Sequence, residues 1–204
     1  METEAILLVQ NLTGENTNRL SFLAPGHGHL TVFKKVGKSI SRKAQPDLFD
    51  TATIHLQTSK DGKYHHLGSY HPSHRRSQIA KKYENFQAAC NLATFMNMNA
   101  SWIEDSTSTY RLLEKALDAF NDSEVHPSII LLKTHYVLLQ QEGYPVRQDW
   151  RVNLPRDDQE NLAKFLHQPL KDLQQVATGA SESILSKLFN WSRHHTSFHF
   201  KNAD

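Results

Sequence analysis

The cations that follow two alternating apolar runs are the residues whose types and spacing point most directly to a chemistry. Residues 34–43 contain five basic side chains and no acidic one, namely Lys34, Lys35, Lys38, Arg42 and Lys43. Lysine and arginine neutralise phosphate oxygens, and several of them together favour a polyanion. The alternating runs on either side of Pro25-Gly26-His27-Gly28 predict a hairpin that leads into this segment. We therefore expect a rigid sheet that presents these cations to a nucleic-acid backbone.

Further cations and aromatic rings in the first part of the chain extend this expectation. Small barrels that bind single strands use cations for phosphates and aromatic rings for bases. The candidate stacking rings are Phe33, Tyr64 and Tyr70, although each of them alone is more often a core residue. The candidate nucleic-acid contacts are Arg19, Lys34, Lys35, Lys38, Arg42, Lys43, Lys63, Arg75 and Arg76, with Lys60, Lys81 and Lys82 beside them.

The charge of the chain is unevenly distributed. Residues 1–82 hold 12 basic and 6 acidic side chains, whereas residues 83–204 hold 11 basic and 15 acidic ones, which gives the overall net charge of +2. The first part also carries seven of the 13 histidines. Such asymmetry indicates an acidic partner for the basic part, and a chance excess of solvated lysines is the alternative interpretation.

Histidine offers the competing chemistry. Three groups have spacings found among metal ligands, namely His27 and His29, then His65, His66, His71 and His74, then His194, His195 and His199. His65 and His66 are neighbours on a predicted strand, so they point to opposite faces and share one metal poorly. Few carboxylates lie near these groups. A His-dependent metal phosphoesterase or nuclease is therefore the alternative function, and we expect solvated histidines with no bound metal and no cofactor.

Familiar catalytic motifs are absent from the sequence. There is no P-loop, no Gly-x-Gly-x-x-Gly that enters a helix, and no Gly-x-Ser-x-Gly. The single cysteine, Cys90, excludes an internal disulfide and lies in an apolar helical context, which predicts an inert buried thiol. No stretch approaches 18 apolar residues. We expect a soluble, cytoplasmic protein that is not an enzyme; a pure protein–protein adaptor is a third possibility.

The periodicity of the apolar residues changes once along the chain. Alternation or short apolar runs predict five strands, near residues 5–10, 20–24, 30–33, 49–57 and 64–70. Spacings of three and four then predict helices near residues 79–96, 110–120, 127–143, 155–165 and 181–191. This order predicts a small closed barrel over residues 1–73 and a helical domain over residues 74–204, an α+β chain.

Several short motifs, taken in order, resemble the bacterial RecO family of recombination mediator and DNA-repair proteins. They are Glu4-Ala5-Ile6-Leu7-Leu8, Glu15 with Arg19-Leu20 and Pro25-x-x-Gly28-x-Leu30, Lys35 to Lys43, Gln45-Pro46, Leu113 to Leu117, and Leu138-Leu139-x-x-x-Gly143-Tyr144. The resemblance implies an N-terminal OB-fold barrel and a helical C-terminal domain. It also implies a non-catalytic, nucleoid-associated protein that binds single- and double-stranded DNA, anneals complementary strands and helps load a recombinase.

The resemblance also implies partners. It predicts binding to RecR and to the acidic C-terminal tail of single-strand-binding protein, with Lys133 at the position of a family residue that engages this tail. The sequence departs from the family at residues 150–158, which contain no cysteine where many members carry a four-cysteine zinc module. We therefore expect no zinc.

Overall fold

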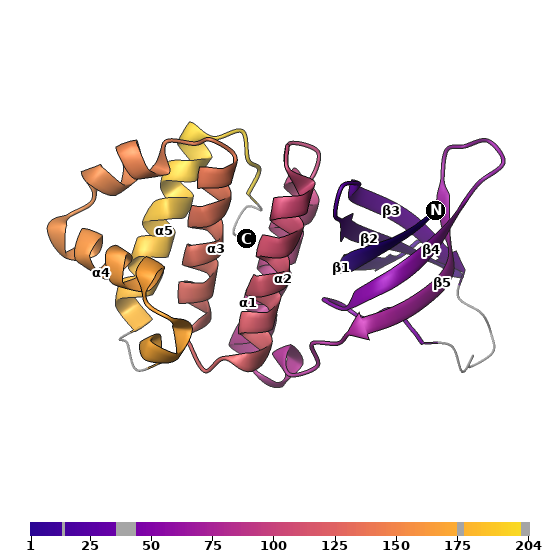
Figure 1. Cartoon of the computed structure of the whole chain (residues 1–204), viewed down its shortest axis with the longest axis horizontal. Helices are drawn as coiled ribbons and strands as arrows, with labels where there is room; N and C mark the ends of the chain where they lie inside the picture. Colours follow the sequence, from indigo (N-terminus) through magenta and orange to yellow (C-terminus); the bar gives the residue numbers. More distant parts are fainter. Residues whose placement is uncertain (14, 36–43, 175–177, 201–204) are drawn as a thin grey trace. The chain divides into compact units, whose positions relative to one another are not determined.

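A computed structural model describes residues 1–13, 15–35, 44–174 and 178–200 of the chain (Figure 1). It confirms the predicted α+β fold class, with an N-terminal five-stranded OB-fold barrel followed by helices. The strands are β1 (Glu2–Leu12), β2 (Thr17–Ala24), β3 (Gly28–Lys35), β4 (Thr51–Thr58) and β5 (His65–His74).

The strand order of the closed barrel is β1-β2-β3-β5-β4. All neighbouring strands are antiparallel except β3 and β5, which pair in parallel through Val32 with His65 and Phe33 with His66. A five-stranded barrel in this order is the OB fold, whose β2–β3 face and connecting loops bind oligonucleotides and oligosaccharides in many proteins. The topology therefore directs attention to the outer face of β2 and β3.

The barrel core consists of the alternate side chains that the strands direct inward. Its buried members are Ala5, Leu7, Leu20, Phe22, Ala24, Val32, Ala52, Ile54, Leu56 and Tyr70. Because side chains alternate along a strand, the inward set fixes which residues of β2 and β3 point to the outside.

Strand β5 runs further than the sequence predicts. The alternating pattern predicts a strand over residues 64–70, yet β5 continues through Pro72 to His74, although proline donates no ladder hydrogen bond. Pro72 pairs with Ala52 beside a shift of register between Thr51 and Ala52. Proline is tolerated in a sheet at such irregularities.

The helical region contains five α-helices and several short helical turns among the described residues. The long helices are α1 (Tyr83–Asn99), α2 (Ser106–Asp122), α3 (Pro127–Gln141), α4 (Arg156–His167) and α5 (Thr178–His195). The turns are η1 (Ile79–Lys81), η2 (Val146–Trp150), η3 (Arg151–Asn153) and η4 (Leu170–Leu173). As the sequence predicts, α3 is buried along most of its length, and Gly143 adopts a left-handed conformation (φ +76°) just after its end.

The chain divides into two compact units. One contains Met1–Arg76 with Ala93–Tyr110, and the other contains Ser77–Leu92 with Arg111–Asp204. The barrel unit therefore includes a helical segment beyond the 1–73 range expected from the sequence. Tyr110 Oη donates to Glu4 Oε1 at 2.9 Å within it. None of the described helices is both long enough and apolar enough to cross a membrane.

Candidate nucleic-acid interface

The outer face of β2 and β3 is open at one end and covered at the other. At the covered end, Leu23 is buried, and His29 Nε2 lies 3.0 Å from Asn97 Oδ1 of the same compact unit. At the open end, Arg19 is exposed and pairs across the strands with Phe33. Lys35 is the exposed outer residue at the end of β3. The open end thus places two cations beside an aromatic ring.

Three rings meet at this open end, and we refer to Phe33, Tyr64 and His66 as the ring cluster. The centroid of Phe33 lies 5.7 Å from that of Tyr64, with the two planes at 83°. The parallel pairing of β3 with β5 brings His66 beside Phe33, at 6.5 Å between centroids. Tyr64 is 52% exposed. Edge-to-face rings leave ring faces open to a nucleic-acid base, which stacks on such faces.

The β4–β5 turn fixes the position of Tyr64. The main-chain N–H of Ser59 donates to Tyr64 O at 2.8 Å, and Tyr64 N–H donates to Ser59 Oγ at 3.1 Å. Ser59 Oγ donates to Asp61 Oδ1 at 2.5 Å, which lowers the pKa of Asp61 below its usual value. Gly62 adopts φ +72°, which glycine alone does without strain. The turn therefore holds Tyr64 in place and leaves Lys63 exposed beside it.

A second group of cations meets at Gln45. Lys34 Nζ donates to Gln45 Oε1, and Arg75 donates to the main-chain oxygen of the same residue at 3.4 Å. Partial burial lowers the pKa of Lys34. Arg75 is also 3.6 Å from Asp50, so part of its charge is neutralised within the barrel unit. Lys38, Arg42 and Lys43 lie outside the described residues, and their predicted contacts stay predictions.

Two residues of the predicted interface are core residues instead. Tyr70 is buried, and its hydroxyl donates to Asp50 Oδ2 at 2.8 Å, so it cannot stack on a base. Arg76 is 3% exposed and donates to Phe49 O at 2.6 Å and to Thr51 Oγ1 at 3.0 Å. The prediction that Arg76 contacts nucleic acid is therefore wrong, because its guanidinium group binds the barrel's own backbone.

Lys133 also forms hydrogen bonds within the protein. Its ammonium group donates to the main-chain oxygens of Phe165, Leu166 and Gln168 at 2.8, 3.3 and 3.0 Å. An ammonium group has three donors, so these acceptors at the end of α4 use all of them. Partial burial lowers the pKa of Lys133. The structure thus gives Lys133 the role of a cap on α4, and its predicted contact with a partner stays a prediction.

Replacing Lys133 with Met is expected to lower the free energy of unfolding by about 1–3 kcal/mol, because charged hydrogen bonds to the end of α4 are lost while the apolar stem is kept. Urea titration measures the change. Affinity for a single-stranded oligonucleotide is expected to stay the same. An unchanged unfolding midpoint would contradict the capping role.

The remaining candidates for chemistry form no cluster among the described residues. No three or more His, Cys, Asp or Glu side chains there are grouped so that they could hold a metal ion. Cys90 is half-buried, and burial raises the pKa of its thiol. His66 enters the candidate interface as a ring neighbour of Phe33, a role that the sequence analysis missed because the register of a parallel strand pair has no local sequence signal.

Sequence comparison does not place this chain in a family. No family model matches it, and no curated protein matches it. The barrel's open face, with the ring cluster and its flanking cations, is the candidate interface.

Proposed function

We propose that this protein binds single-stranded DNA through the open end of the barrel's β2–β3 face. The observation that carries the proposal is the ring cluster, with Arg19, Lys35 and Lys63 exposed around it. Cations beside exposed rings suit a strand whose phosphates and unstacked bases are both accessible. A duplex hides its base faces, so the ring cluster favours a single strand.

The proposed cellular role is that of a recombination mediator. In this role the protein anneals complementary strands without bond-breaking chemistry and helps load a recombinase onto DNA coated with single-strand-binding protein. Support comes from the OB-fold barrel with helices after it and from the RecO-like motifs of the sequence. RecR, double-stranded DNA and the tail of single-strand-binding protein are proposed as further partners.

Charge reversal of Arg19 and Lys35 tests the proposed face. The Arg19→Glu, Lys35→Glu variant is expected to bind a labelled single-stranded oligonucleotide at least about tenfold more weakly, because two phosphate contacts become repulsive. Its slope of log affinity against log salt is expected to fall by about 1.4, since each contact to a single strand contributes about 0.7. Fluorescence anisotropy at several salt concentrations measures both quantities.

A matched variant controls for net charge. Lys115 and Lys171 are exposed cations of the other compact unit, and their reversal to Glu changes the net charge equally. This control is expected to keep the wild-type salt slope. If both double variants lose affinity to the same extent, binding follows overall charge and the proposed face is wrong.

A further inference from the structure

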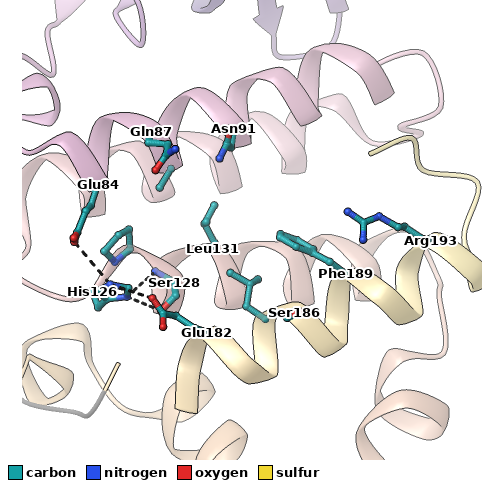
Figure 2. Close-up of a pocket in the computed structure, with 13 residues that line it drawn as sticks. Glu84, Gln87, Asn91, His126, Ser128, Leu131, Glu182, Ser186, Phe189 and Arg193 are labelled. Atoms are coloured by element: carbon teal, nitrogen blue, oxygen red, sulfur yellow. Dashed lines mark hydrogen bonds and ion pairs between the residues drawn. The ribbon is translucent and has the colours of Figure 1, made fainter. Parts of the chain in front are cut away.

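The compact unit that contains α3 and α5 has an open groove of about 500 Å³ (Figure 2). One wall is a stripe of α1, formed by Glu84, Gln87 and Asn91, and the other is a stripe of α5. Residues three and four apart lie on the same face of a helix, so each stripe faces the groove along its length. The α5 stripe contains Glu182, Ser186, Phe189 and Arg193. None of these residues belongs to the proposed DNA-binding face.

One end of the groove is acidic. Glu84 and Glu182 approach His126 from opposite walls, with carboxylate oxygens 3.8 and 3.7 Å from His126 Nε2 (Figure 2). The other ring nitrogen, Nδ1, accepts the main-chain N–H of Ser128 at 3.4 Å and lies 2.7 Å from Ser128 Oγ. Nδ1 of His126 thus faces Ser128, and Nε2 faces the carboxylates. Both carboxylates are well exposed, so this end offers two negative charges to a cation.

The opposite end of the groove is basic. Arg193 follows Glu182 by eleven residues on α5, which is about 16 Å along a helix. The guanidinium group of Arg193 lies over the ring of Phe200, 5.5 Å from its centroid. Stacking uses the face of a guanidinium group and leaves its edge N–H groups for a carboxylate. The groove thus has opposite charges at its two ends.

The middle of the groove combines apolar and amide groups. Leu131 and Leu185 provide apolar surface, while Gln87 and Asn91 of α1 face Ser186 of α5. A side-chain amide both donates and accepts hydrogen bonds, which matches the N–H and C=O groups of an extended peptide. An extended chain covers about 3.3 Å per residue, so about five residues span the distance between the charged ends.

We propose that this groove binds an extended segment of a partner protein, about five residues long. A Lys or Arg side chain of the segment pairs with Glu84 and Glu182 at the acidic end, and an Asp or Glu side chain pairs with Arg193. The opposite charges at the two ends determine this choice, since a uniformly acidic or uniformly basic segment is repelled at one end. The inference is independent of DNA binding by the barrel.

Selection from a phage-displayed library of random heptapeptides, with the full-length protein as bait, tests the proposal. Enriched peptides are expected to combine Lys or Arg with Asp or Glu at a separation of four or five residues. A synthetic peptide of the enriched sequence is expected to bind Glu182→Lys and Arg193→Glu variants about tenfold more weakly than the wild type, by fluorescence anisotropy. Both substituted residues are exposed, so both variants are expected to fold.

A charge-swapped peptide distinguishes direct contact from indirect damage. A peptide whose acidic residue is replaced by Lys is expected to bind the Arg193→Glu variant more tightly than it binds the wild-type protein. No enrichment over an Arg193→Glu bait, in which both ends of the groove are acidic, equal affinity for all variants, or failure of the swapped peptide to restore binding would each overturn the proposal. Enrichment of peptides that lack one of the two charges would overturn it as well.

Discussion

Replacing both Phe33 and Tyr64 with alanine is expected to weaken binding of single-stranded DNA by at least about 30-fold. Stacking of a base on an aromatic side chain contributes about 1–3 kcal/mol, and two such contacts together give a loss of this size. Each single substitution is expected to cost more than half of the binding free energy that the double variant loses, because the two rings support each other edge to face at 5.7 Å. Anisotropy titration of the two single variants and the double variant measures the loss and the coupling.

The loss should come from the rings and not from the stability of the barrel. Phe33 and Tyr64 lie outside the buried core cluster, so the unfolding midpoint of the double variant is expected to change little compared with its affinity. Tyr83 provides a matched control, because this tyrosine is 74% exposed and lies outside the barrel unit. Tyr83→Ala is expected to keep wild-type affinity. Undiminished binding by the Phe33→Ala, Tyr64→Ala variant would exclude the ring cluster as the base-binding site.

The second large effect concerns His135 and the stability at acid pH of the compact unit that contains α3 and α5. His135 is buried in α3, donates from Nδ1 to Leu131 O at 2.9 Å and packs edge to face on Phe189. Burial lowers the pKa of His135 from its ordinary value of 6.5 to about 4. The unfolded chain therefore takes up a proton at this residue over a pH range in which the folded chain does not.

The sign of the pH dependence follows from this difference in proton binding. The residue costs no stability above about pH 6.5, and the folded state loses stability as the pH falls from there to about 4. Over this pH window, the loss of unfolding free energy that is due to His135 amounts to about 3 kcal/mol. Wild type is therefore expected to lose about that much more unfolding free energy between pH 7.5 and pH 4 than a His135→Leu variant, in urea titrations.

An exposed histidine serves as the control for this measurement. His194 lies on the surface near the end of α5, and His194→Leu is expected to give a pH profile parallel to that of wild type. If His135→Leu also gives a parallel profile, another buried group governs the acid stability.

The elements of the fold were predictable because their signals are local. Alternation in β2 and the turn at Gly26 and Gly28, both with positive φ, define the first hairpin. The continuous apolar sequence of α3 predicts its burial equally well. Predictions failed where a distant contact overrides a local signal. Pro72 does not end β5, because a register shift in the β4–β5 pairing accommodates it.

The candidate site was predictable only in part. Exposed cations such as Arg19 and Lys35 follow from strand alternation, but nothing local separates exposed Arg75 from buried Arg76 beside it. That distinction depends on Phe49 O, 27 residues earlier in the chain, which accepts the Arg76 hydrogen bond. Likewise, nothing in the local sequence distinguishes Tyr64 from Tyr70. The difference depends on the buried hydrogen bond from the Tyr70 hydroxyl to Asp50.

The pairing of β3 with β5 determines when the ring cluster is assembled during folding. The two strands are parallel neighbours in the barrel, and they pair through Val32 with His65 and Phe33 with His66. Parallel pairs between distant segments form slowly, because the entropy of closing a long loop must be overcome first. The ring cluster is built across this junction. A newly synthesised chain would therefore lack the assembled ring cluster until β3 and β5 have paired.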